Sequence, residues 1–156
     1  MKKTLILATV ALMLATALIG CNVSRAPIDA ATFAEKAEAA GYRIQNAIDQ
    51  LAEGKADDYL IAIAGAETIN YQIEFIVVPT VQQAITAYQD NRADFEAQKG
   101  STSSYSSVSL GNVSSYKLTS NGRYFVISRI ENTFVYINAS VEYKDGIVDF
   151  LKTIGY

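Results

Sequence analysis

Apolar residues recur along this chain with the period of a helix in three places. The segments 32–40, 80–99 and 143–154 carry apolar residues three and four positions apart, as one buried helix face requires. Thr32 and Thr80 each stand three residues before Glu or Gln, a pattern in which both side chains satisfy end groups of a helix. A glycine follows each segment, as is common after a helix. We therefore expect three helices.

Between these helices the apolar residues alternate with polar ones or form short runs, which is typical of β-strands. The expected strands are 59–64, 71–77, 116–119, 123–130 and 133–139. The segment 42–51 fits a helix or a strand, and we favour a strand at its start. Asn121-Gly122 predicts a two-residue hairpin turn, because tight turns of this kind need positive φ at both positions. The serine-rich segment 101–109 predicts a mobile loop.

The order of these elements is helix, strands, helix, strands, helix. Strands that follow one another through short turns pair antiparallel. We therefore predict an α+β fold, with an antiparallel sheet built of two meanders and about three helices. Residues 32–156 are long enough to bury one core and are expected to form a single domain.

The start of the chain has a different pattern. Lys2 and Lys3 precede an uncharged apolar run over residues 5–19, and Gly20 stands just before the only cysteine, Cys21. The run is shorter than the ~20 residues that a membrane-spanning helix needs. A basic start, a short apolar core and a small residue at its end are typical of a secretion signal.

Residues 18–21, Leu-Ile-Gly-Cys, resemble the lipobox of bacterial lipoproteins. The resemblance implies cleavage before Cys21 and attachment of diacylglycerol to its sulfur, with palmitate among the acyl chains. Residues 1–20 are then a signal peptide, and residues 21–31 a lipidated tether on the extracytoplasmic face of the cell membrane. The alternatives are an ordinary cleavage site beside an ordinary cysteine, or an uncleaved anchor. The chain as a whole resembles the many small uncharacterised lipoproteins of Gram-positive bacteria, although Asn22 leaves the host cell type open.

Charge argues against nucleic acid as a partner. Removing residues 1–20 takes Lys2 and Lys3 from 13 basic residues and leaves 11 against 16 acidic ones, a formal charge of −5. Nucleic-acid binding depends on basic groups that neutralise phosphates, so an acidic domain without a basic cluster is a poor candidate.

The absence of histidine and of a free thiol excludes several kinds of chemistry. The chain has no histidine, which excludes Ser-His-Asp catalysis and zinc sites built on histidine. With Cys21 acylated, no thiol remains for a disulfide, a metal site or a nucleophile. We therefore expect no cofactor and no metal.

Two short motifs resemble catalytic ones. Ser114 and Lys117 match the Ser-x-x-Lys motif of penicillin-recognising enzymes, but that motif belongs at a helix start, whereas here it lies beside a predicted strand. Asp57 and Asp58 are adjacent carboxylates, but neighbouring residues of a strand point to opposite faces and do not converge. We interpret the first as a chance match and the second as a solvated turn.

The best binding candidate is one face of the predicted sheet. Alternation places Arg129, Phe134, Tyr136 and Asn138 on one face, and Glu74 joins them if its strand lies alongside. A mixed aromatic and polar surface can dock a ligand or a protein, in which case these side chains are partly exposed. The alternative is that a helix covers this face and Glu74 pairs with Arg129.

Together these observations predict a membrane-anchored extracytoplasmic domain that acts by binding and is not an enzyme. Its partner is expected to be an envelope protein, a peptide or a cell-wall glycan. The alternative is an envelope hydrolase that works with carboxylates alone.

Overall fold

The structure is a computed structural model and describes residues 24–156. The expected signal peptide and Cys21 lie outside these residues. The described helices are α2 (Ala30–Ala39), α3 (Val81–Ala97) and α4 (Lys144–Ile154), with the short turns η1 (Ile48–Gln50) and η2 (Val141–Tyr143). The strands are β1 (Arg43–Asn46), β2 (Asp58–Ala64), β3 (Tyr71–Val77), β4 (Ser103–Leu110), β5 (Val113–Ser120), β6 (Arg123–Ile130) and β7 (Thr133–Ser140).

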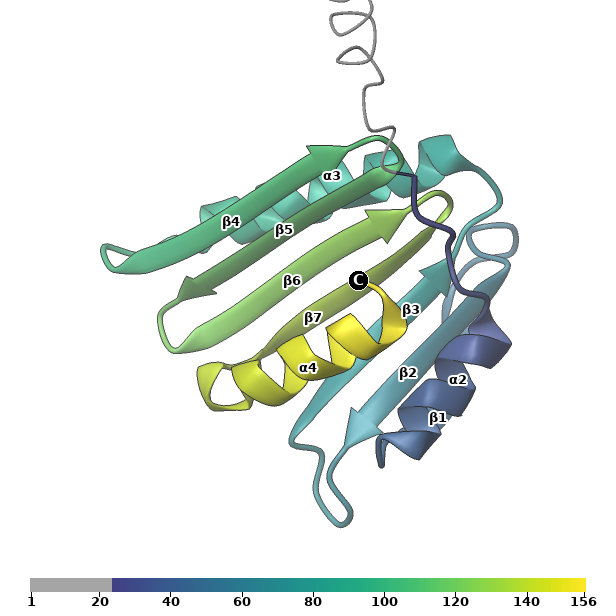
Figure 1. Ribbon diagram of the computed structural model, residues 1–156, viewed down its shortest axis with the longest axis horizontal. Helices are drawn as coiled ribbons and strands as arrows, with labels where there is room; N and C mark the ends of the chain where they lie inside the picture. The colour runs from purple at the N-terminus through teal and green to yellow at the C-terminus, as the bar shows by residue number, and fades with distance from the viewer. Residues whose placement is uncertain (1–23) are drawn as a thin grey trace, which may run out of the picture.

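The strands of this part of the chain form one antiparallel sheet in the order β1-β2-β3-β7-β6-β5-β4 (Figure 1). Two meanders, β1–β3 and β4–β7, meet where β3 pairs antiparallel with β7. The predicted α+β fold, with two antiparallel meanders and three helices, is therefore confirmed. The strand favoured at the start of 42–51 is also found, as β1, and η1 follows it.

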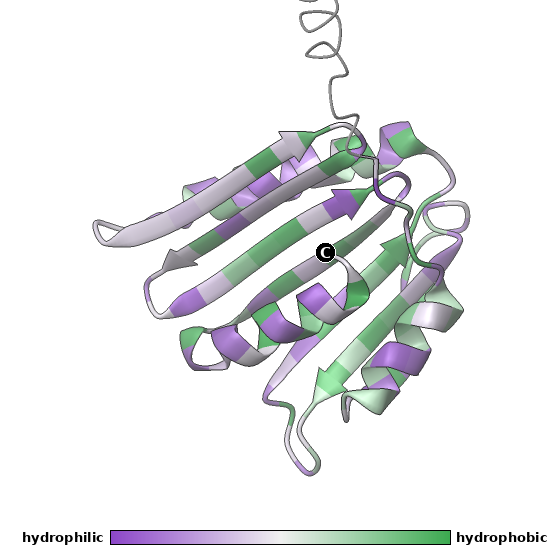
Figure 2. Ribbon diagram, viewed as in Figure 1, coloured by the Kyte–Doolittle hydropathy of each residue, from purple (hydrophilic) through white to green (hydrophobic). Residues whose placement is uncertain are grey.

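Helices lie on both faces of the sheet, and a core of buried apolar side chains lies on each face. α2 and α4 pack on one face and α3 on the other (Figure 1). On the first face, Phe33 is fully buried and stacks on Phe75, with ring centroids 4.6 Å apart, and it meets Phe150 edge-on. On the second, Phe95 packs against Phe125. The central strands therefore bury both of their faces, and Figure 2 shows apolar residues running along them.

The two threonine motifs behave differently. At α3 the predicted pair forms, because Gln83 N–H donates to Thr80 Oγ1 (3.2 Å) and Thr80 Oγ1 donates to Gln83 Oε1 (2.9 Å). At α2 the predicted cap at Thr32 is wrong. Asp29 caps this helix by accepting a hydrogen bond from Thr32 N–H (2.7 Å), and that bond also lowers the pKa of Asp29. The helix therefore begins earlier than predicted, at Ala30.

The serine-rich segment 101–109 differs most from its prediction. Instead of a mobile loop it contributes most of β4, which pairs with β5 along its whole length. Every residue of β4 is exposed. No buried face therefore imposes an apolar alternation on its sequence, and the pattern that predicts strands is missing.

The predicted turns are confirmed. Asn121 and Gly122 join β5 to β6 with φ values of 51° and 74°, the signature of the expected tight turn. Gly41 and Gly155 follow α2 and α4 with φ values of 87° and 88°, a conformation that glycine adopts at little cost.

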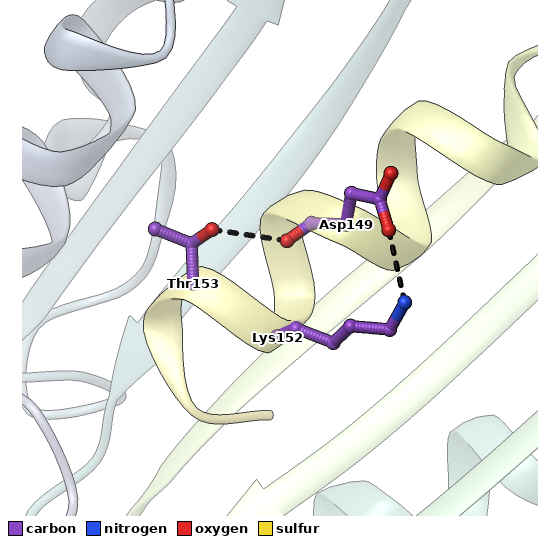
Figure 3. A network of polar contacts seen from close by, with 3 residues as sticks. All are labelled: Asp149, Lys152 and Thr153. Atoms are coloured by element: carbon purple, nitrogen blue, oxygen red, sulfur yellow. Dashed lines mark hydrogen bonds and ion pairs between the residues drawn. The ribbon is translucent and has the colours of Figure 1, made fainter.

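Local contacts hold the outward face of α4, as Figure 3 shows. Lys152 Nζ pairs with Asp149 Oδ1 at 2.9 Å, and Thr153 Oγ1 donates to the Asp149 carbonyl at 3.0 Å. The two charged side chains are 71% and 77% exposed, so their pairing contributes little stability. Lys36 Nζ of α2 donates to the Thr153 carbonyl (2.8 Å). This last contact joins α2 to α4, whereas the other two lie within α4.

Candidate binding cleft beside helix α3

Helix α3 covers only part of its face of the sheet and leaves a cleft beside it. Its main contacts are with β5, β6 and β7, in one half of the sheet. A cleft of about 820 Å³ opens beside α3. Its other walls are strands β2, β3 and β7 and the segment that leads from the end of η1 towards β2. Its size falls within the range of roughly 300–1,000 Å³ that is usual for small-molecule sites.

Side chains from three neighbouring strands line the cleft from the sheet: Tyr59 of β2, Glu74 of β3 and Tyr136 of β7. The Tyr59 hydroxyl donates to Glu74 Oε2 at 2.7 Å, and Gln72 Nε2 donates to Glu74 Oε1 at 3.3 Å. Burial raises the pKa of Tyr59, and the hydrogen bond to Glu74 raises it further. The phenol therefore keeps its proton at neutral pH and holds the carboxylate in place.

Tyr136 is the second aromatic side chain of the cleft. Its ring centroid lies 5.2 Å from that of Phe95, so α3 supports one side of the ring. The antiparallel register of β3 and β7 places Tyr136 directly opposite Glu74. Tyr136 is half-buried, and this burial is the main reason why its pKa is raised. The cleft therefore combines a fixed aromatic ring with a neighbouring carboxylate.

Uncharged polar side chains form much of the wall. Gln83 and Asn91 come from α3 and Gln50 from η1, and each amide offers both donors and acceptors. Asn91 Nδ2 is engaged by the Ala87 carbonyl of its own helix at 2.8 Å. This set of amides and aromatic rings suits a ligand with neutral hydrogen-bonding groups and an apolar surface.

Three of the five binding residues predicted from the sequence line this cleft: Glu74, Phe134 and Tyr136. Strand β3 does lie alongside β7, as the inclusion of Glu74 required. The expected partial exposure holds for Tyr136 but is wrong for Phe134, which is only 7% exposed because it packs in the core beneath α3.

The other two predicted residues lie elsewhere. Arg129 is only 5% exposed, and its guanidinium donates to the Glu131 carbonyl (2.9 Å) and to Ser114 Oγ (3.4 Å). The alternative pairing of Arg129 with Glu74 does not occur. Asn138 is exposed and accepts a hydrogen bond from Arg123 Nε (2.7 Å), in a smaller hollow at the other end of α3.

The sequence did not point to the amides of α3 and η1. Gln83 was identified only as a partner in a helix cap, and Asn91 and Gln50 carry no motif. The one signal is Asn91, a polar residue on the same helical stripe as the buried Ala84, Tyr88 and Phe95. These amides line a cleft only because the sheet extends past α3, which depends on strand order.

The remaining sequence motifs gain no support as sites. Ser114 and Lys117 are three positions apart on β5, so their side chains lie on opposite faces of the sheet. Within residues 24–156, no group of three or more His, Cys, Asp or Glu side chains is placed to hold a metal ion. In the same part of the chain, no helix has the length and apolar character needed to span a membrane.

Comparisons of this chain with protein families, with curated proteins and with solved structures found no match.

Proposed function

We propose that this chain is a membrane-anchored extracytoplasmic binding domain, held by lipid on Cys21, whose ligand occupies the cleft beside α3. The proposal assigns it no catalytic activity of its own. Its support is the signal-like start of the chain on one side and the geometry of the cleft on the other.

The observation that carries the binding proposal is the lining of the cleft. Two aromatic rings, Tyr59 and Tyr136, flank a carboxylate whose position is fixed by two hydrogen bonds. Ligand sites in proteins are largely apolar and contain a few well-placed polar groups. The charged side chains of the lining are Lys55, Glu74 and Asp90, one basic and two acidic, so a neutral peptide or glycan suits the cleft better than a strongly charged ligand.

The start of the described chain supports an anchor close to the sheet. Arg25 N–H donates to Asn112 Oδ1 (3.0 Å), and Asn112 Nδ2 donates to the Arg25 carbonyl (2.7 Å). Asn112 belongs to the turn between β4 and β5. Cys21 precedes Arg25 by four residues, which span at most ~14 Å. An acylated Cys21 therefore keeps the domain near the membrane rather than on a long tether.

Replacing Cys21 by serine tests the anchor. We expect Cys21→Ser to lose acylation and to leave the protein either unprocessed or released from the membrane fraction, because the lipid is attached through the sulfur. Two acyl chains give stable anchoring, since each buried methylene adds ~0.8 kcal/mol. Fractionation and mass spectrometry of the full chain check this. A serine variant that is processed and retained like the wild type rules out the anchor.

Filling the cleft tests the binding site. Thr86 lies in α3, is exposed and lines the cleft. We expect Thr86→Trp to reduce capture of the ligand from envelope extracts at least tenfold, because the indole occupies its space. Gln89→Trp is the matched control, since Gln89 is exposed on the same helix and does not line the cleft.

The two tryptophan variants should have closely similar unfolding free energies, because surface changes are usually within ±0.5 kcal/mol. Pull-down from membranes followed by mass spectrometry, with peptide and peptidoglycan fractions analysed separately, gives the readout. Equal capture by both variants contradicts the proposed site.

A hydrolase that uses carboxylates alone is the second candidate, because Glu74 and Asp90 line the same cleft. Such a mechanism needs one carboxyl group that donates a proton. Both hydrogen bonds made to Glu74 come from donors, so its oxygens act as acceptors. The proton would then have to come from Asp90, which is exposed at the rim of the cleft. This arrangement favours binding over catalysis. If captured material were cleaved by the wild type and left intact by Glu74→Gln, the hydrolase would be the better account.

A further inference from the structure

Strand β4 ends the sheet with a row of backbone groups that no other strand pairs. The turn between β4 and β5 contains two residues, Gly111 and Asn112, and its flanking pair is Leu110 and Val113. The pair that flanks a two-residue hairpin turn is hydrogen-bonded. Because this pattern alternates along the strand, the even-numbered residues of β4 bond to β5.

The odd-numbered residues therefore direct their N–H and C=O groups to the open edge. They are Ser103, Tyr105, Ser107 and Ser109. With one donor and one acceptor each, they present eight backbone groups. An additional strand can pair with all of them.

This edge lacks the usual features that prevent pairing. Natural edge strands are kept short or carry Lys, Pro or a bulge. β4 is eight residues long, carries no charge and no proline, and pairs with β5 without a bulge. The opposite edge, β1, has four residues. Three large side chains of β4 are also half or more exposed: Tyr105 (63%), Val108 (52%) and Leu110 (50%). Figure 2 shows β4 as a mostly pale strand at the edge of a greener sheet.

We propose that two copies of this chain associate through β4, antiparallel and around a two-fold axis at Ser106. In this register Ser103 pairs with Ser109 of the second copy and Tyr105 with its Ser107, so all eight groups of each edge are used. Shifting the axis to Tyr105 or Ser107 leaves an outward residue of each copy unpaired. The symmetric register at Ser106 therefore makes the largest number of hydrogen bonds.

The self-complementary register and the lack of charge on β4 favour a second copy as the occupant. Two uncharged strands bring no like charges opposite one another, a contact that destabilises sheets. The nearest charge on the α4 side is Lys117, which is paired with Ser106 on β5. The two Lys117 side chains then stand three strand spacings apart, ~14 Å, which is beyond the screening length of ~8 Å. On the other face the charge nearest to the edge is Lys99, whose Nζ lies over the Tyr105 ring of its own chain at 4.2 Å. The two Tyr105 rings become diagonal neighbours there, within reach of one another.

Cysteine cross-linking of the full chain in its own membrane tests this pairing. A Ser106→Cys pair at the axis is a non-hydrogen-bonded pair with Cα atoms ~4.5 Å apart, which a disulfide can bridge. Ser104→Cys is the matched control, because its two copies are offset by four residues, more than 10 Å along the strand. We expect at least tenfold more disulfide-linked dimer from Ser106→Cys than from Ser104→Cys, with the 106–106 linkage identified by peptide mass mapping.

A third variant blocks pairing at the open edge of β4 without changing the fold. Ser107→Pro deletes an outward N–H and none of the hydrogen bonds to β5, so it should abolish the Ser106→Cys cross-link. The wild-type chain, run alongside, reports any linkage through Cys21. No dimer from Ser106→Cys, equal linkage at positions 104 and 106, a cross-link to a different protein, or a cross-link that survives Ser107→Pro each overturns the proposal.

Discussion

Raising the pH from about 9 to about 12 is expected to destabilise the folded domain strongly, because its buried tyrosines resist ionisation. Burial raises the pKa of Tyr156 from 10.0 to about 12, and burial is also the largest cause that raises the pKa of Tyr42, Tyr59, Tyr124 and Tyr136. Above pH 10 an unfolded chain releases these protons while the folded domain retains them, so alkali favours unfolding.

The magnitude follows from Tyr156, which is 8% exposed. Raising the pKa of Tyr156 from 10.0 to about 12 corresponds to ~2–3 kcal/mol of stability, which is fully present below pH 10 and lost as the pH rises towards 12. Urea unfolding at a series of pH values measures this loss. Tyr156→Phe is the control, because phenylalanine does not titrate, and it should flatten the pH dependence. It also removes the hydrogen bond with Thr133, which costs ~1 kcal/mol at all pH values below 10. Equal slopes for both proteins contradict this account.

Truncating Phe33 is expected to cause the largest loss of stability of any single change considered. Phe33 is fully buried, stacks on Phe75 and meets Phe150 edge-on, so it joins α2, α4 and the sheet. Phe33→Ala should lower the unfolding free energy by ~3–5 kcal/mol, since it removes apolar contacts and leaves a cavity. Chemical denaturation measures the change, and Ile69→Ala, at a position 61% exposed, serves as a near-neutral control. A loss below 1 kcal/mol for Phe33→Ala is incompatible with the packing of α2 on the sheet.

The sequence predicts an element well when its side chains carry the reason for it. The alternation on β6 and β7 follows from their two buried faces, and it correctly sorts Phe134 and Tyr136 from Val135 and Ile137. Helix α4 and the turn at Asn121 were predicted for similar reasons, since an apolar stripe and a φ requirement leave traces in composition.

Two of the failures have a common cause, which is that the missing information lies in distant parts of the chain. β4 forms because β5 offers a free edge, and backbone hydrogen bonds do not depend on the serine side chains. The cleft exists because β3 joins β7, which leaves β2 and β3 beyond the main contacts of α3. The failure at α2 has a local cause instead. Asp29 accepts a hydrogen bond from Thr32 N–H and caps the helix, so Thr32 lies inside its first turn.

The central claim is that the cleft beside α3 receives a ligand. The most direct test is a photo-activated cross-linker placed in that cleft. A benzophenone side chain introduced at Thr86 faces the cleft, and the same group at Gln89 lies on α3 outside it. After irradiation of intact cells that carry the full chain, mass spectrometry reports every adduct. We predict one discrete adduct from position 86, peptide or glycan, that is absent from position 89. No adduct at position 86, or the same adducts at both positions, would contradict the claim.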